Sequence, residues 1–174
     1  MNIIAHSLLP VVIKQFCEFK NFSGLEYRNQ VKGWIAIGIA GSLPDMIDPH
    51  LTIGARYDSY SHTWLFVSAF VLVCIITFFF ARRKWYNRVS LWCALAYLLH
   101  VAGDIASGGI DFLHTGNVIG GWWITPELWP VLDLLLLVGF ILLNRKIRHQ
   151  HGLNPSIIRR LLERIVYGKA KDIS

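Results

Sequence analysis

A run without any charged side chain begins at Trp64 and ends at Ala81, and it reads WLFVSAFVLVCIITFFFA. At ~1.5 Å per residue, a helix of this length spans roughly 27 Å, which is close to the ~30 Å hydrocarbon core of a bilayer. The alternative is the core helix of a soluble protein, but a helix that is apolar on every face is unusual in a chain of 174 residues. The run therefore predicts a membrane-spanning helix.

Composition and four further segments extend this prediction to the whole chain. Mean hydropathy is +0.45, 54% of the residues are hydrophobic and only 16% are charged, so the chain is more apolar than an ordinary soluble domain. Two further long apolar segments are Val89–Ile105 and Leu128–Asn144, and two shorter ones are Ile3–Phe16 and Val31–Leu43. We expect an all-α fold, a polytopic membrane bundle of about four or five helices, in which the two shorter segments either span or are re-entrant.

The basic residues are segregated along the chain. All but one of the 17 Lys and Arg residues fall in three blocks, at 14–32, at 81–88 and after 144. Short loops rich in Lys and Arg stay in the cytoplasm, and with these blocks inside, the hydrophobic segments alternate in direction. The N-terminus is then outside and the C-terminus cytoplasmic. Because this pattern accounts for the pI of about 9.4, we expect membrane lipids and no nucleic acid as partners.

Two regions of different character follow from this pattern. Residues 1–148 are predicted to form the membrane bundle, and residues 149–174 a cytoplasmic tail. In the tail, apolar residues recur at helical spacing and face a basic side; they are Ile157, Ile158, Leu161, Leu162, Ile165 and Val166. Such an amphipathic helix either lies on the anionic leaflet or packs on the ends of the bundle.

Histidines and carboxylates gather between the basic blocks. His100 and Asp104 are four residues apart in a hydrophobic segment, so they share one helical face and can reach a single ion. Ionisable groups inside a membrane segment are expensive and usually functional. The alternative is a structural hydrogen bond between the imidazole and the carboxylate.

Two more motifs map to the same outer depth. Residues 41–50 read GSLPDMIDPH, where the two prolines predict a stiff irregular turn that carries Asp45 and Asp48. A simple membrane-exit turn is the alternative. Ser61-His62-Thr63 stands at the outer start of the longest segment, and His6 lies in the outer half of the first segment. Imidazoles and carboxylates that meet at one depth indicate a zinc-type site, with other divalent ions possible.

In order and spacing these motifs resemble the bacterial inner-membrane metal-dependent hydrolases called YdjM-like. The resemblance covers residues 1–130, and its elements are His6, Gly41-Ser-Leu-Pro-Asp45-Met-Ile-Asp48, Ser61-His62-Thr63, His100-Val-Ala-Gly-Asp104 with Gly108-Gly109, and Trp129-Pro130. More distantly, the order is similar to that of zinc-dependent phospholipase C, an all-helical enzyme.

The resemblance implies a metal centre whose ligands are His6, Asp45, His62, His100 and Asp104. The ion would be Zn²⁺, with Mn²⁺ or Mg²⁺ as alternatives, and it would activate water for attack on a phosphodiester or ester of a lipid. Asp48, or whichever carboxylate is not coordinated, would be the general base. The resemblance places His50 beside the ligands, and leaves only His114 and Glu127 as candidates for a further metal. It implies a bacterial inner membrane, and the charge pattern places the site on the periplasmic side. With a lipid substrate, Trp122, Trp123 and Trp129 would anchor their loop among the headgroups, and an ordinary aromatic belt is the alternative.

The chain departs from the family pattern between His50 and His62, where it reads LTIGARYDSYS and lacks the usual His-Arg-Gly approach. This departure leaves the substrate open. Two other classes of protein remain possible at this point. One is a non-catalytic membrane scaffold with a structural metal or a His–Asp polar cluster. The other is an ion transporter, which would need ionisable groups along the whole membrane depth, whereas the inner halves of the segments hold almost none.

Overall fold

The computed structural model describes residues 3–20, 27–49, 57, 59–81 and 84–152. Within them, long helices are α1 (Ile3–Lys20), α2 (Tyr27–Ile47), α3 (Trp64–Phe80), α4 (Lys84–Ala106) and α5 (Trp129–Gln150). Short 3-10 helices precede two of them, η2 (Tyr60–His62) before α3 and η3 (Pro126–Leu128) before α5. This part of the chain is all-helical, as predicted. His50 and the predicted amphipathic helix of the tail lie outside the described residues.

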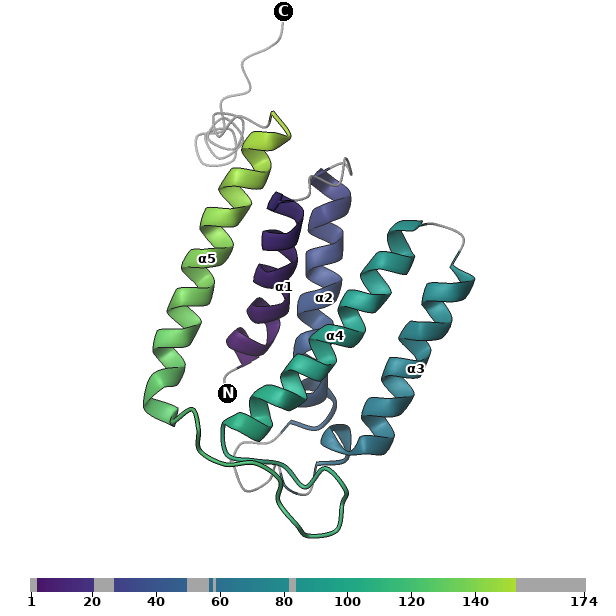
Figure 1. Cartoon of the computed structure of the whole chain (residues 1–174), viewed down its shortest axis with the longest axis vertical. Coiled ribbons are helices and arrows are strands. Elements are labelled where there is room, and N and C mark those ends of the chain that lie inside the picture. Colours follow the sequence, from purple (N-terminus) through teal and green to yellow (C-terminus); the bar gives the residue numbers. More distant parts are fainter. Residues whose placement is uncertain (1–2, 21–26, 50–56, 58, 82–83, 153–174) are drawn as a thin grey trace, which may run out of the picture.

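Consecutive long helices run in opposite directions (Figure 1). Helices α1, α2 and α4 pack on one another, α5 packs on α1, and α3 packs on α4. The start of α1, the end of α2, the start of α3, the end of α4 and the start of α5 therefore lie at the same end of the bundle, which is the lower end in Figure 1. All the motifs singled out in the sequence belong to these segment ends.

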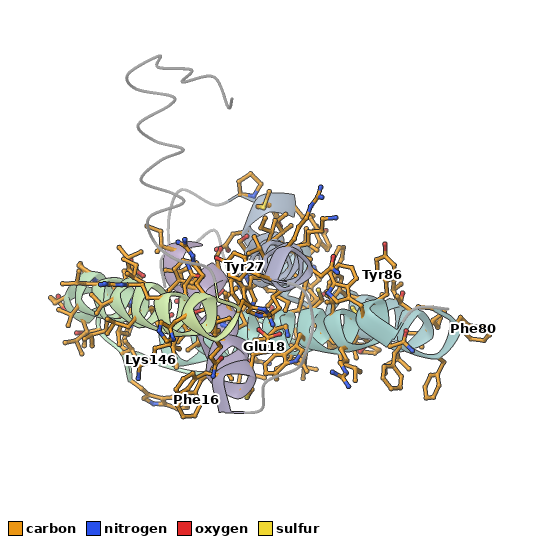
Figure 2. All side chains as sticks on the ribbon, turned by 90° about the horizontal axis from the view of Figure 1, so that it is seen from above. Phe16, Glu18, Tyr27, Phe80, Tyr86 and Lys146 are labelled. Atoms are coloured by element: carbon orange, nitrogen blue, oxygen red, sulfur yellow. The ribbon has the colours of Figure 1, made fainter. Side chains whose placement is uncertain are left out.

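The two outermost helices leave much of their apolar surface uncovered. Large exposed hydrophobic side chains lie along α3 and α5; examples are Leu65, Leu72, Val73, Phe79, Phe80, Val131, Leu134, Leu135 and Leu142. Figure 2 shows Phe80 pointing away from the edge of the bundle and Glu18 lying among the helices. A soluble bundle has the opposite arrangement, with its apolar stripes turned inward.

Helix length agrees with this surface. Two helical stretches, Trp85–Ala106 and Pro126–Gln150, are long and apolar enough to cross a membrane, and α3 is a shorter apolar helix of 17 residues. The predicted segments Ile3–Phe16 and Val31–Leu43 lie within α1 and α2, which do not meet that test among the described residues.

Buried apolar side chains form two clusters in the core. One joins α1, α2, α4 and α5 through Val11, Trp34, Ile37, Ala40, Ala96 and Ile147. The other joins α3, α4 and the segment after α4 through Val67, Tyr97, Val101 and Ile110. Within the first cluster, Val11, Ile37 and Ala96 lie along α1, α2 and α4 between the polar side chains near the two ends of the bundle.

Helix α2 differs from the sequence prediction at its end. It continues through Pro44 to Ile47, so Asp45 lies on a helix, and only Asp48 lies on the predicted irregular turn. Proline removes one backbone donor, which would have bonded to the carbonyl four residues earlier. Pro44 itself is fully buried, and its carbonyl accepts a hydrogen bond from Ser61 Oγ (2.9 Å), which ties the end of α2 to η2.

Candidate metal centre

Four ionisable side chains converge at the lower end of the bundle. Asp45, His62, His100 and Asp104 each offer one ligand atom, and these atoms lie within 4.8 Å of one another, so the group could hold a metal ion. The residues come from α2, η2 and α4, three elements that end or begin at this depth. We call them the four-ligand group.

The closest contacts within the group centre on Asp104. Its Oδ2 atom lies 3.0 Å from His62 Nε2 and 3.1 Å from His100 Nε2, and the two Nε2 atoms are 3.0 Å apart. Asp45 Oδ1 is farther out, at 3.7 Å from His62 Nε2 and 3.5 Å from His100 Nε2. In a tetrahedral zinc site with bonds of 2.0–2.1 Å, neighbouring ligand atoms are separated by about 3.3 Å. The spacing therefore fits a tetrahedral ion.

His100 is held with its Nε2 atom toward the group. Its Nδ1–H donates to the carbonyl of Gly41 at 2.7 Å, so in the neutral imidazole Nε2 carries the lone pair. This second hydrogen bond fixes the tautomer in the way that is usual for a metal-ligating histidine. The spacing of four also brings His100 and Asp104 together, because both side chains project from the same face of α4.

His62 is oriented by hydroxyl groups. Its Nδ1 atom lies 2.8 Å from Ser59 Oγ and 3.1 Å from Ser61 Oγ, and Tyr97 OH donates to the carbonyl of Ser61 at 2.6 Å. Burial lowers the pKa of His62, and the carboxylate of Asp104 only partly opposes this effect. A neutral imidazole is the form that binds a metal.

His6 lies beside the group but contacts a different oxygen. Its Nε2 atom is 3.1 Å from Asp104 Oδ1, and its ring stacks on that of His100 with centroids 3.8 Å apart. Helices α1 and α2 come close at this level, since a Cβ atom on Gly41 would lie 2.4 Å from the His6 carbonyl oxygen. His6 thus supports the carboxylate that the other two histidines share, and it is not one of the four converging residues.

Exposure distinguishes the two carboxylates of α2 and its following turn from the rest. The side chain of Asp45 is 11% exposed, whereas those of His62, His100 and Asp104 are fully buried, so Asp45 is the member of the group that is partly exposed. Asp48 is not part of the group, and its Oδ2 atom accepts a hydrogen bond from the backbone N–H of Tyr60 at 3.1 Å. This contact ties the end of α2 to η2.

The remaining predicted residues lie apart from the group. The ring of His114 stands 5.1 Å from that of Tyr60, and Glu127 is exposed in η3. In the part of the chain that the structure describes, neither belongs to a cluster that could hold a second metal. Trp122 stacks on Trp129 with centroids 6.5 Å apart. Tyr97 was missed in the sequence, although it shares its helical face with His100 and Asp104 at spacings of three and seven.

A second buried polar cluster occupies the other half of the bundle. Lys14 Nζ donates to Glu18 Oε1 at 2.6 Å, and Trp34 Nε1 donates to Glu18 Oε2 at 2.8 Å. The ammonium also lies 5.6 Å from the centre of the Trp92 ring. The sequence-based expectation that the inner halves hold almost no ionisable groups is thus wrong for α1, because the helix extends to Lys20 and carries this pair into the core. We call these four residues the Lys14 cluster.

No family model, no curated protein and no solved structure matches this chain. Its function is therefore argued from the geometry above.

Proposed function

We propose that this chain is a multi-pass protein of a bacterial inner membrane that holds a divalent ion at the outer end of its bundle and hydrolyses a phosphodiester or ester bond, with a lipid as the substrate class. One observation carries the proposal. His62 Nε2, His100 Nε2 and Asp104 Oδ2 meet within 3.1 Å of one another, and both imidazoles are turned toward that point by hydrogen bonds on their far side.

The membrane location is supported by the surface and by the charges. Apolar side chains cover the outside of α3 and α5, and basic residues collect at the end of the bundle opposite the four-ligand group; they are Arg28, Lys32, Arg88, Arg145, Lys146 and Arg148. By the positive-inside rule that end is cytoplasmic, which leaves the group on the periplasmic side.

Zn²⁺ fits the group best, because two imidazoles and carboxylate oxygen in a tetrahedral arrangement are typical zinc ligands; Mn²⁺ and Mg²⁺ are the alternatives. Such an ion lowers the pKa of water and polarises a phosphoryl or carbonyl oxygen. The chain itself orients the ligands and supplies a carboxylate that accepts a proton. Asp45 is better placed than Asp48 for that role, since it is beside the ligands and reaches the exterior.

A second candidate is a membrane scaffold with a structural metal. It is favoured by the number of protein ligands, because four would complete a tetrahedral shell and leave no position for water. The longer separations of Asp45 from both histidines favour the enzyme. An ion pathway is disfavoured because Val11, Ile37 and Ala96 form an apolar layer between the four-ligand group and the Lys14 cluster.

Metal analysis of detergent-purified protein is the first test. We expect near-stoichiometric Zn²⁺ or Mn²⁺ in the parent protein and background amounts in His100→Ala and Asp104→Ala. His149→Ala is the matched control, since His149 is exposed at the far end of α5. All variants are compared by size exclusion to verify folding. A folded parent protein that stays metal-free after reconstitution, or ligand variants that retain the metal, would overturn the metal site.

Activity is tested separately on the metal-loaded protein. Hydrolysis of a chromogenic phosphodiester and of phospholipids in mixed micelles is followed with and without chelator, with the His100→Ala protein as blank. Turnover that the chelator and the variant both abolish supports the hydrolase. Tight metal binding without turnover of any of these substrates favours the scaffold.

A further inference from the structure

The segment between α4 and α5, residues 107–128, folds into a small hairpin that we call the 107–128 loop. Two isolated bridges pair its arms, Ser107 with Trp122 and Ile110 with Ile119. The backbone of Gly121 donates to the carbonyl of Ile105 at 3.0 Å, which fixes the hairpin to the end of α4. Figure 1 shows the loop below the ends of α4 and α5, crossing toward α3.

Further contacts hold the loop beside the four-ligand group. The carbonyl of Phe112 accepts a hydrogen bond from the backbone of Trp64 at 2.9 Å, and Gly109 N donates to the carbonyl of Asp104 at 2.9 Å. At the turn, Asp111 accepts hydrogen bonds from the backbone N–H groups of Thr115 and Gly116. Burial would raise the pKa of Asp111, but these donors outweigh it and lower the pKa. The hairpin is therefore held in a defined conformation by hydrogen bonds within it and to α3 and α4.

The outer surface of this hairpin is apolar and aromatic. Exposed hydrophobic side chains on it are Leu113, Val118, Ile119, Trp122, Trp123 and Leu128, and Trp123 is the most exposed of them at 75%. Residues 107–128 include no Lys or Arg. The surface is continuous along the chain with the exposed apolar side of α5, which begins at Val131.

We propose that the 107–128 loop docks into the headgroup region of the outer leaflet, with Leu113 and Trp123 as its inserted side chains. Indole rings prefer this depth, where the ring is apolar and its N–H is hydrated. The absence of basic residues favours insertion by apolar contact over attraction to anionic lipids. Because the loop is hydrogen-bonded to the backbone of Asp104, its docking holds the four-ligand group, with its partly exposed Asp45, near the lipid surface. An amphipathic substrate then reaches the site from the leaflet. This inference rests on the proposed membrane location.

The experiment places a polarity-sensitive fluorophore on single cysteines of the full chain in phosphatidylcholine vesicles. The background is Cys17→Ser, Cys74→Ala and Cys93→Ala. Leu113→Cys and Trp123→Cys report on the inserted side chains, and Asn117→Cys is the matched control, because Asn117 is exposed and polar in the same hairpin. We expect several-fold weaker iodide quenching at 113 and 123 than at 117, together with quenching by lipids that carry a nitroxide near the headgroup.

A label at Leu135→Cys in α5 separates this inference from the proposed location. Leu135 is exposed and apolar about two turns into that helix, so nitroxides along the acyl chains of the outer leaflet must quench it if α5 spans the bilayer. Quenching at 135 with iodide access at 113 and 123 equal to that at 117 would overturn the docking of the loop alone. Absence of quenching at 135 would overturn both the membrane location and the docking.

Discussion

Two buried polar clusters share this bundle, and they are completed in different ways. The Lys14 cluster neutralises itself, since its ammonium faces its carboxylate and an indole N–H satisfies the second oxygen. In the four-ligand group, the ion pairs that the described residues form are all between histidines and carboxylates, and two imidazole nitrogens and carboxylate oxygens converge on one point. Burial alone therefore does not identify a site. What distinguishes the four-ligand group is that its converging atoms are all of the types that bind a metal cation.

The largest effect is expected from breaking the self-sufficient cluster. Glu18→Gln would leave the ammonium of Lys14 buried without its counter-ion, and such a change lowers the free energy of unfolding by about 3–5 kcal/mol. The double variant Lys14→Met, Glu18→Gln removes both charges and should recover most of the loss. Denaturation in mixed detergent micelles measures the free energy of unfolding of the parent protein and of both variants. If Glu18→Gln alone were as stable as the parent protein, the Lys14–Glu18 pair would be hydrated and not part of the core.

The opposite response is expected from the four-ligand group, which should gain stability from an added ion. At a free Zn²⁺ concentration of 100 times Kd, binding to the folded state alone raises the free energy of unfolding by about 2.7 kcal/mol. Asp104→Asn should lose this increment, whereas Glu18→Gln should keep it despite its lower baseline. Unfolding curves with Zn²⁺ and with chelator give the difference. Equal curves in the parent protein would contradict the comparison between the clusters.

Local rules explain how much of this arrangement the sequence predicts. Spacing of four places His100 and Asp104 on one face, and alternating segment directions bring Asp45 and His62 to the same end. The helical fold follows from uninterrupted apolar runs. These features depend on periodicity and charge order, which can be read along a single chain.

The rest depends on how helices pack, which periodicity does not specify. The contact of His6 with the far oxygen of Asp104 requires the close approach of α1 to α2. In the sequence Lys14 and Glu18 belong to a predicted cytoplasmic basic block. They are buried because α1 extends to Lys20 and packs against α5, α2 and α4. Pro44 predicted a turn, but α2 continues through it to Ile47, and Pro44 is fully buried there.

A glycine pair on α2 tests that close approach. A Cβ atom on Gly41 would lie 2.4 Å from the His6 carbonyl oxygen, whereas one on Gly38 would be 3.6 Å from the nearest atom, in ordinary contact. Gly41→Ala should therefore destabilise the protein by about 1–3 kcal/mol and weaken metal binding, because Gly41 also orients His100. Gly38→Ala should be neutral or stabilising by up to about 1 kcal/mol, from its higher helix propensity. Thermal unfolding and metal titration measure both. Equal effects of the two substitutions would show that the helices can separate here without consequence.

The smallest effect on the protein is expected from substituting residues that orient a ligand but do not bind the metal themselves. Ser59→Ala with Ser61→Ala removes both hydroxyl partners of His62 Nδ1 and leaves every ligand in place. Loss of such supporting hydrogen bonds typically weakens metal affinity by about 10–100-fold, and competition with a chromophoric chelator measures the affinity. Ser90→Ala is the control, since Ser90 Oγ donates to the carbonyl of Asn87 near the start of α4, on the far side of the apolar layer. Unchanged affinity in the double variant would mean that backbone position alone fixes His62. A loss of affinity confined to the double variant would instead show that the hydroxyl groups orient a buried histidine as a ligand, whereas the Lys14 cluster pairs its charges within itself.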